Sequence, residues 1–288
     1  MKEAEYYHAL DDRRVMCDLC PHHCVVADGH RGRCRSRVCH RGKLYSEAYG
    51  RPCALAIDPI EKKPLAWFHP GTDCLSVACT GCNLSCRNCQ NHDISQAAPS
   101  DVASEQLSPR DLIGLARRYG QNQIAYTYTE PLTWIEYMRD TARLAHEAGM
   151  ANILVSAGYV CHQPLADLLP YLDAANIDLK SFSDTIYNKV SGASLQPVLD
   201  TLQAIRQAGV WLEITHLLIP TINDDPRQTR LMCQWLVGNG FADVPLHITR
   251  FFPQYRLTDI PPTPIDTMQN ARRIALEVGM RRVKLGNV

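Results

Sequence analysis

Three cysteines in the run G-C-N-L-S-C-R-N-C-Q-N have the residue type and spacing to hold an iron–sulfur cluster. Cys82, Cys86 and Cys89 are spaced C-x3-C-x2-C and directly follow an apolar segment. Three thiolates on one loop can ligate three corners of a [4Fe-4S] cluster, whereas ferredoxins supply four cysteines per cluster. The fourth iron then keeps an open position, as catalytic metal sites do. The spacing therefore predicts an enzyme that binds S-adenosylmethionine at this iron and cleaves it to a radical.

A zinc knuckle is the alternative interpretation of the same loop. Structural zinc needs four ligands, and Cys79 and His92 lie near enough in the sequence to supply the fourth. A related alternative is a non-catalytic iron–sulfur or zinc scaffold, or an electron-transfer protein, in which the metal is fully coordinated by the chain. A protein of that kind is not expected to bind S-adenosylmethionine.

The composition limits the partners of the chain. Its 288 residues include 30 basic and 30 acidic side chains, so no net field attracts it to nucleic acid or to an anionic membrane. The amino terminus mixes both charges and lacks the apolar stretch of a signal peptide. Thirteen cysteines without an export signal are typical of metal ligands in a reducing compartment. We therefore expect a cytoplasmic protein that binds neither membranes nor nucleic acid.

Residues 1–72 form a cysteine-rich extension ahead of a core domain that we predict over 73–288. The extension has few core residues, so its fold needs a cross-link for stability. This favours a bound metal over free thiols. Both zinc and a second iron–sulfur cluster are compatible with its cysteines. The stretch 30–43 adds six basic residues and no acid, and it suits a solvated loop, thiolate stabilisation or docking of an acidic partner protein. The candidate ligands, spaced C-x2-C-x3-C-x9-C, are Cys17, Cys20, Cys24 and Cys34.

Beyond residue 72, short apolar runs alternate with amphipathic stretches, which predicts parallel strands joined by crossover helices. Ser108-Pro109 and Asp225-Pro226 each combine an N-cap residue with proline at the first helical position. This α/β alternation favours a partial β/α barrel or an open doubly wound sheet. The other helices are expected to begin at Pro131, after Ser194 and near residue 265. The predicted strands are Leu75–Ala78, Ile124–Tyr128, Ile153–Val155, Ile177–Leu179, Val210–Leu218 and Leu246–Ile248.

Polar residues follow the predicted strands, where β/α barrels carry their active groups. Asp178 and Lys180 are two apart on one strand, so they point to the same side and together suit a zwitterionic ligand. Each residue also has a plainer explanation: a helix cap for Glu130, a surface ion pair for Asp178 with Lys180, and core burial for His216. The joint placement favours a ligand site. Its members are Thr129, Glu130, Ser156, Asp178, Lys180, His216 and His247.

Eight stretches, in order along nearly the whole chain, resemble the radical S-adenosylmethionine (SAM) enzymes of the pyruvate formate-lyase activating-enzyme type. The chain most closely resembles the radical SAM enzyme of the AmmeMemoRadiSam system. This resemblance implies a partial (β/α)6 barrel. The stretches are C-D-L-C-P-H-H-C (17–24), I-E-K-K-P-L (60–65), G-C-N-L-S-C-R-N-C-Q-N-H-D-I-S (81–95), T-Y-T-E-P (127–131), S-A-G-Y-V (156–160), I-D-L-K (177–180), I-P-T-I-N-D (219–224) and H-I-T-R-F-F-P-Q-Y (247–255).

The resemblance also implies roles for the polar residues. Thr129 and Glu130 stand in place of a Gly-Gly-Glu turn whose members contact the methionine amino group. Asn88 stands where many such loops carry an aromatic residue near adenine, and we assign it to the cofactor-binding set. The other implied contacts with methionine, its carboxylate or the ribose are Ser156, Asp178, Lys180 and His216. The candidate catalytic residues are Lys180, His216 and His247.

The predicted function is that of a radical SAM oxidoreductase. One electron from reduced flavodoxin or ferredoxin cleaves S-adenosylmethionine to methionine and a 5′-deoxyadenosyl radical, which abstracts hydrogen from a substrate. That substrate is either a partner protein, as in glycyl-radical activation, or a small molecule, and no motif in the chain separates the two.

Overall fold

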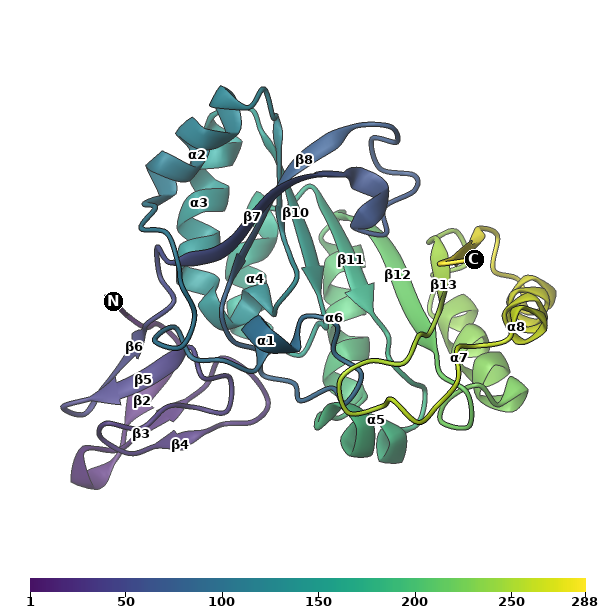
Figure 1. Cartoon of the computed structure of the whole chain (residues 1–288), viewed down its shortest axis with the longest axis horizontal. Helices are drawn as coiled ribbons and strands as arrows, with labels where there is room; N and C mark the ends of the chain where they lie inside the picture. Colours follow the sequence, from purple (N-terminus) through teal and green to yellow (C-terminus); the bar gives the residue numbers. More distant parts are fainter.

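The computed structural model describes residues 1–288 and contains one large sheet and two small ones. The large sheet has the order β14-β13-β12-β11-β10-β9-β8-β7, and all its neighbouring strands are parallel except the β7 and β8 pair. All six predicted strands are present as β8 to β13, which confirms the predicted α/β class (Figure 1). The strands are β7 (Pro52–Pro59), β8 (Asp73–Cys79), β9 (Gln123–Tyr126), β10 (Ala151–Ser156), β11 (Ala174–Asp178), β12 (Trp211–Leu218), β13 (Leu246–Arg250) and β14 (Val283–Gly286).

The predicted helix starts are met closely. The Ser108 hydroxyl accepts the Asp111 amide and the Asp225 carboxylate accepts the Arg227 amide, so both N-caps form. Pro131 opens a 3-10 turn rather than an α-helix, and the α-helix begins only at Ile135. The helices are α1 (His92–Ser95), α2 (Pro109–Arg118), η3 (Pro131–Trp134), α3 (Ile135–Glu147), α4 (His162–Leu168), α5 (Asp184–Ser191), α6 (Gln196–Gln207), α7 (Pro226–Gly238) and α8 (Ile265–Val278). None of them is long and apolar enough to cross a membrane.

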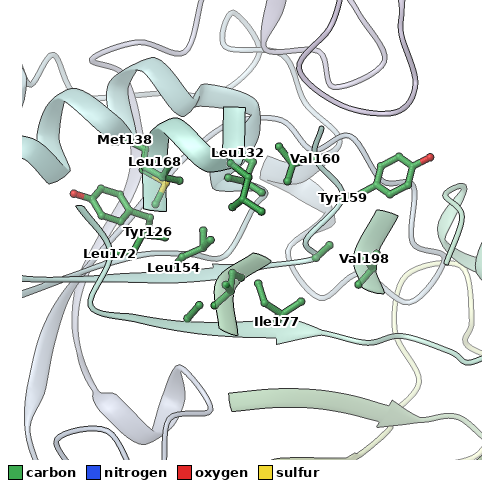
Figure 2. Packing of buried hydrophobic residues seen from close by; sticks show 14 of the residues in the cluster. Tyr126, Leu132, Met138, Leu154, Tyr159, Val160, Leu168, Leu172, Ile177 and Val198 are labelled. Carbon is green, nitrogen blue, oxygen red and sulfur yellow. The ribbon is translucent and has the colours of Figure 1, made fainter. Parts of the chain in front are cut away.

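The two faces of the large sheet are covered differently. The main core of 56 buried residues joins one face to the helices, and Figure 2 shows part of it, with Leu154 of β10 below Met138 and Leu168 from helices, and Ile177 of β11 toward Val198 of α6. On the other face, a smaller cluster packs Ile60 and Leu65 from the segment after β7 against strand residues such as Ala125. This segment, residues 60–72, includes the 3-10 turn η2 (Ile60–Lys62). It covers the face of the sheet opposite the helices, here called the inner face, where no helix packs.

The amino-terminal extension folds into two antiparallel sheets beside the large one (Figure 1). They end at Ser46, and the large sheet already begins with β7 at Pro52, earlier than the predicted boundary at residue 72. The six-residue I-E-K-K-P-L stretch therefore belongs structurally with the core. The small strands are β1 (Lys2–Glu3), β5 (Arg37–His40) and β6 (Lys43–Ser46) in one sheet, and β2 (Tyr7–Ala9), β3 (Val15–Cys17) and β4 (Val25–Val26) in the other.

The extension closely approaches the core at Gly81. This residue has φ +98°, and a Cβ there would lie 2.4 Å from the Cys34 carbonyl oxygen and 2.7 Å from Ser36 Oγ. We expect Gly81→Ala to lower the free energy of unfolding by about 3 kcal/mol, from backbone strain and overpacking together. Gly71→Ala is the matched control, because Gly71 has φ +78° but open space around it, and about 1 kcal/mol is expected there. Urea unfolding measures both, and equal costs would contradict the close contact.

Candidate active site

The cysteine loop, residues 81–90, is held in place by hydrogen bonds from elements distant in sequence. The Ser85 amide donates to the Ser191 carbonyl at the end of α5, at 2.9 Å. On the side of the extension, His22 Nε2 lies 2.8 Å from the Asn83 carbonyl oxygen. Because both contacts use backbone groups of the loop, its path is fixed by the fold rather than by a ligand.

A second segment covers the loop from the side of β13. In the connection between β13 and α8, the Arg256 amide donates to the Arg87 carbonyl at 2.8 Å. The Tyr255 ring stacks on His92, with 4.3 Å between ring centroids. His92, the predicted alternative zinc ligand, therefore packs against an aromatic ring just beyond the loop.

The three predicted cluster ligands lie in surroundings that suit a metal. Burial raises the pKa of the Cys82 and Cys86 thiols, so each needs a nearby cation to become a thiolate. No three cysteine, histidine or carboxylate side chains in the structure converge closely enough to hold one metal ion. Ligands of a four-iron cluster need not converge so closely, because each sulfur binds a different iron. Cys79, the other candidate fourth zinc ligand, is instead buried opposite the bulge at Cys53 on β7. The donor set thus fits a cluster held at three corners.

Asp178 and Lys180 lie on the same side of the sheet, as their spacing predicts. Their side chains form an ion pair with 2.8 Å between Lys180 Nζ and Asp178 Oδ2. Together with Asn88 and Thr215 they line a small cavity of about 30 Å³, which is closed by apolar residues of β12 and the loop after it, including Leu217. The structure therefore brings three of the predicted cofactor-binding residues to one pocket beside the cysteine loop.

Lys180 is the cation next to the cysteine loop. Burial alone would lower the pKa of Lys180, but the opposing charges of Asp178 and Cys86 hold it well above its ordinary value of 10.5. The same charge acts in return on Cys86, where burial raises the thiol pKa and Lys180 lowers it. A permanently charged ammonium group at this position attracts anions, whether a thiolate ligand or a carboxylate.

Glu130 and Ser156 are tied to each other. Glu130 is buried, and its carboxylate accepts the Ser156 hydroxyl at 2.7 Å, the Ala157 amide at 2.9 Å and the Leu132 amide at 3.2 Å. Burial raises the pKa of Glu130, and these hydrogen bonds oppose that rise. The structure therefore gives Glu130 the helix-capping role that was its plainer explanation, and it adds a clamp between the ends of β9 and β10.

Thr129 also holds neighbouring backbone in place. Its hydroxyl donates to the Cys79 carbonyl at 2.6 Å and accepts the indole N–H of Trp134 at 3.4 Å. It thus fixes the turn after β9 against the end of β8, immediately ahead of the cysteine loop.

The two predicted strand histidines are not at the pocket. His216 is buried, and its Nδ1 lies 2.7 Å from the Leu179 carbonyl oxygen, while the alternate residues Thr215 and Leu217 line the cavity. His247 Nε2 lies 2.6 Å from Glu213 Oε2, in a buried pair near the start of β13. Glu213 also accepts the amides of residues 66 and 67. His247 Nε2 thus contacts the carboxylate that holds residues 66 and 67, which is a structural role, and its catalytic assignment stays a prediction.

A buried polar cluster on that inner face escaped the sequence analysis. The Asp58 carboxylate accepts Lys63 Nζ at 2.6 Å and the Ser76 hydroxyl at 2.7 Å, and it also accepts the Tyr128 hydroxyl. Lys63 Nζ lies 4.4 Å from the centroid of the Tyr128 ring. Tyr128 has φ +65°, which is uncommon for a bulky residue, and its carbonyl accepts the side-chain amide of Asn91 beside the cysteine loop. The stretches 60–65 and 127–131 contain Lys63 and Tyr128, but no spacing rule joins them to each other or to Asp58 and Ser76.

In a comparison with known protein families, the radical SAM superfamily matches residues 76–232 of this chain. The uncharacterized protein MJ0808 of Methanocaldococcus jannaschii is 44% identical over all of this chain and 86% of its own length. The pyruvate formate-lyase-activating enzyme of Clostridium pasteurianum is 26% identical over 52% of this chain and 63% of its own length. The pyruvate formate-lyase 1-activating enzyme of Escherichia coli K12 is 21% identical over 69% of this chain and 87% of its own length.

Solved structures share the fold at low identity. Streptococcus suis SuiB bound to S-adenosylmethionine superposes with a TM-score of 0.55 at 10% identity, covering 72% of this chain and 48% of SuiB. Native anSMEcpe with bound AdoMet superposes with a TM-score of 0.52 at 14% identity, covering 72% of this chain and 61% of that one. These likenesses concern the arrangement of helices and strands.

Proposed function

Because the chain belongs to the radical SAM superfamily, we propose that it is an enzyme that binds a [4Fe-4S] cluster through Cys82, Cys86 and Cys89 and cleaves S-adenosylmethionine reductively. The single observation that carries the proposal is the position of these three cysteines, on one framed loop whose neighbouring pocket pairs a cation with an anion. When bound, the cluster supplies the electron that breaks the sulfonium–C5′ bond, and the resulting 5′-deoxyadenosyl radical abstracts hydrogen from the substrate.

The residues of the chain would bind and orient S-adenosylmethionine. Lys180 presents a positive charge and Asp178 a negative one, and methionine carries a carboxylate and an ammonium group of the opposite signs. Asn88 and Thr215 add polar groups to the same cavity, and Leu217 adds an apolar wall that excludes water. The hydrogen bonds of Glu130 with Ser156 and Ala157 support a positioning role for Glu130 and Ser156, which hold the ends of β9 and β10 together beside the pocket.

The electron donor and the substrate are also part of the proposal. A low-potential one-electron carrier, reduced flavodoxin or ferredoxin, is the class of donor that this chemistry requires. The similarity to activating enzymes supports an oxidoreductase that acts on a partner protein to generate a glycyl radical, and a small-molecule substrate is the alternative. The motifs along the whole chain support membership of the AmmeMemoRadiSam group.

The decisive experiment is anaerobic reconstitution with iron and sulfide, followed by dithionite and S-adenosylmethionine. We expect 5′-deoxyadenosine and methionine as products. A protein that carries its full complement of iron yet forms no 5′-deoxyadenosine would favour the scaffold or electron-transfer alternative. Running the reaction in D2O and with candidate deuterated substrates would then identify the hydrogen donor from the label in 5′-deoxyadenosine.

Replacing Lys180 by methionine is expected to weaken S-adenosylmethionine binding by about 10- to 100-fold, because one charge-assisted contact is lost and Asp178 is left without its partner. Anaerobic calorimetric titration of the reconstituted protein measures the effect. Lys189→Met is the matched control, since Lys189 is exposed on the neighbouring helix α5. An unchanged affinity in Lys180→Met would remove this residue from the site.

A further inference from the structure

We propose that Cys17, Cys20, Cys24 and Cys34 ligate a second [4Fe-4S] cluster, complete in its cysteine ligands, and that this cluster passes an electron to the cysteine loop. The four thiols line one cavity, together with the apolar side chains of Leu19 and Val26. Three of them, Cys17, Cys20 and Cys34, are buried. Four soft sulfur donors around one apolar cavity in the fold are the ligand set of an iron–sulfur cluster or of structural zinc.

The local backbone gathers the four ligands. The Cys17 amide donates to the Cys24 carbonyl at 3.0 Å, and the His23 amide donates to the Cys20 carbonyl at 3.1 Å, so the ligands before β4 lie on one closed turn. Cys34 comes from a separate turn before β5. His23 and Arg35, the neighbours of Cys24 and Cys34, have φ of +42° and +65°, which is unusual for residues with side chains. Strained backbone next to ligands is common where a site must be held open.

Zinc and a four-iron cluster differ in how closely their thiolate ligands must approach one another. Around one tetrahedral zinc ion, sulfurs lie about 3.8 Å apart, because each Zn–S bond is about 2.3 Å long. In neither the extension nor the cysteine loop do three thiols converge closely enough to hold one metal ion. The space now between the extension thiols is small, about 10 Å³. Three of the four ligands stand on turns outside the strands.

A buried arginine that is already paired with one carboxylate also lines the cavity. Arg37 is 1% exposed and lines the same cavity as the thiols. Its guanidinium donates to the Thr133 carbonyl at 3.3 Å and to the Glu5 carbonyl at 3.1 Å, and it forms an ion pair with Glu136. A cluster with four thiolates is anionic, and an anion is stable in an apolar pocket only with a fixed positive charge nearby.

The cavity adjoins the cysteine loop through Asn83. This residue directly follows Cys82 and also lines the extension cavity, and its side-chain amide donates to the Tyr159 carbonyl at 2.7 Å. Consecutive Cα atoms are about 3.8 Å apart, which places the two sets of sulfurs on the order of 10 Å from each other. An electron can tunnel directly over that distance. The protein donor would reduce the extension cluster by one electron, and that cluster would be reoxidised as the loop cluster is reduced.

The site is tested without the loop cluster, in the triple variant Cys82→Ala, Cys86→Ala, Cys89→Ala. After anaerobic reconstitution we expect about four irons per chain and, after dithionite, the electron paramagnetic resonance signal of a reduced four-iron cluster. One zinc ion with no iron, or no metal at all in a folded protein, would overturn the proposal. This outcome is independent of S-adenosylmethionine cleavage, so failure here leaves the proposed function standing.

The electron transfer from the extension cluster to the loop cluster rests on the proposed function. It is tested in the double variant Cys20→Ala, Cys34→Ala, and Cys53→Ser is the control for loss of a cysteine. We expect the double variant to keep the loop cluster and its affinity for S-adenosylmethionine, while reduction of that cluster by reduced flavodoxin slows at least tenfold. Stopped-flow absorbance measures the rate. Equal rates in the double variant and the control would overturn this electron transfer, and if the double variant does not fold, the single variant Cys24→Ser, at the half-buried ligand, supplies the same comparison.

Discussion

Replacing Cys86 by alanine is expected to reduce the formation of 5′-deoxyadenosine from S-adenosylmethionine at least a thousandfold. Two thiolates on one loop cannot hold a four-iron cluster securely, and the loop side chains supply the ligands for only three corners. The half-buried Cys86 thiol also lies near Lys180, so its removal takes away the loop-side partner of that ammonium group. Product is measured by chromatography after anaerobic reconstitution and reduction.

The iron content of the same variant makes the result specific. We expect it to fall by about four irons per chain, while Cys233→Ala retains the full content, because Cys233 is buried in α7 away from both groups of thiols. Unchanged iron and an unchanged four-iron signal in Cys86→Ala would contradict the assignment. A single zinc ion released by the same substitution would support the zinc knuckle instead.

Asp58→Asn is expected to lower the free energy of unfolding by about 3–5 kcal/mol. The substitution keeps the shape of the side chain but removes the charge that balances the buried ammonium group of Lys63, and an unpaired buried charge is costly. The inner face of the sheet has no helix to compensate, because residues 60–72 cover it. Urea unfolding at neutral pH measures the loss.

The matched control is Lys62→Met. Lys62 contacts the same carboxylate at 2.7 Å but is 62% exposed, so a loss below about 1 kcal/mol is expected. The double variant Asp58→Asn, Lys63→Met should regain part of the stability, because it leaves no unpaired charge. Similar losses for Lys62→Met and Asp58→Asn would show that burial does not set the strength of these contacts.

The same carboxylate predicts an acid dependence. Burial alone raises the pKa of Asp58, but hydrogen bonds from Lys62, Lys63, Tyr128 and Ser76 outweigh it and hold the pKa below its ordinary value of 3.8. A depressed pKa means that the stabilisation is fully present above that value and is lost as the pH falls below it. The stability of the parent protein should therefore decline between about pH 4 and pH 2 more steeply than that of Asp58→Asn.

Local sequence signals predicted the strands and the cysteine loop well. Apolar runs bounded by turn residues placed all six strands, and C-x3-C-x2-C lies on a single loop, so neither depends on distant contacts. Helix starts at Ser108 and Asp225 were equally local, since each cap bonds within its own first turn. The edge strands β7 and β14 were missed, because β7 lies in a segment with prolines at both ends and β14, V-K-L-G, has only two apolar residues.

Side-chain roles that depend on register were less predictable. The pairing of His247 with Glu213 follows from how β13 aligns with β12, and Glu213 in turn meets a segment about 150 residues earlier. Nothing near His247 in the sequence distinguishes this role from a catalytic one. Asp178 and Lys180 were placed correctly because their relation is set within one strand and its end.

The contact at Gly81 limits how this protein can be divided or recombined. The carbonyl of Cys34 occupies the space where any other residue at 81 would carry its side chain, and His22 holds the next turn of the same loop. The core domain of a relative with alanine at this position could not accept this amino-terminal extension unless its cysteine loop moved. Chimeras that exchange the two parts are therefore expected to succeed only when both sides of the junction are transferred as a matched pair.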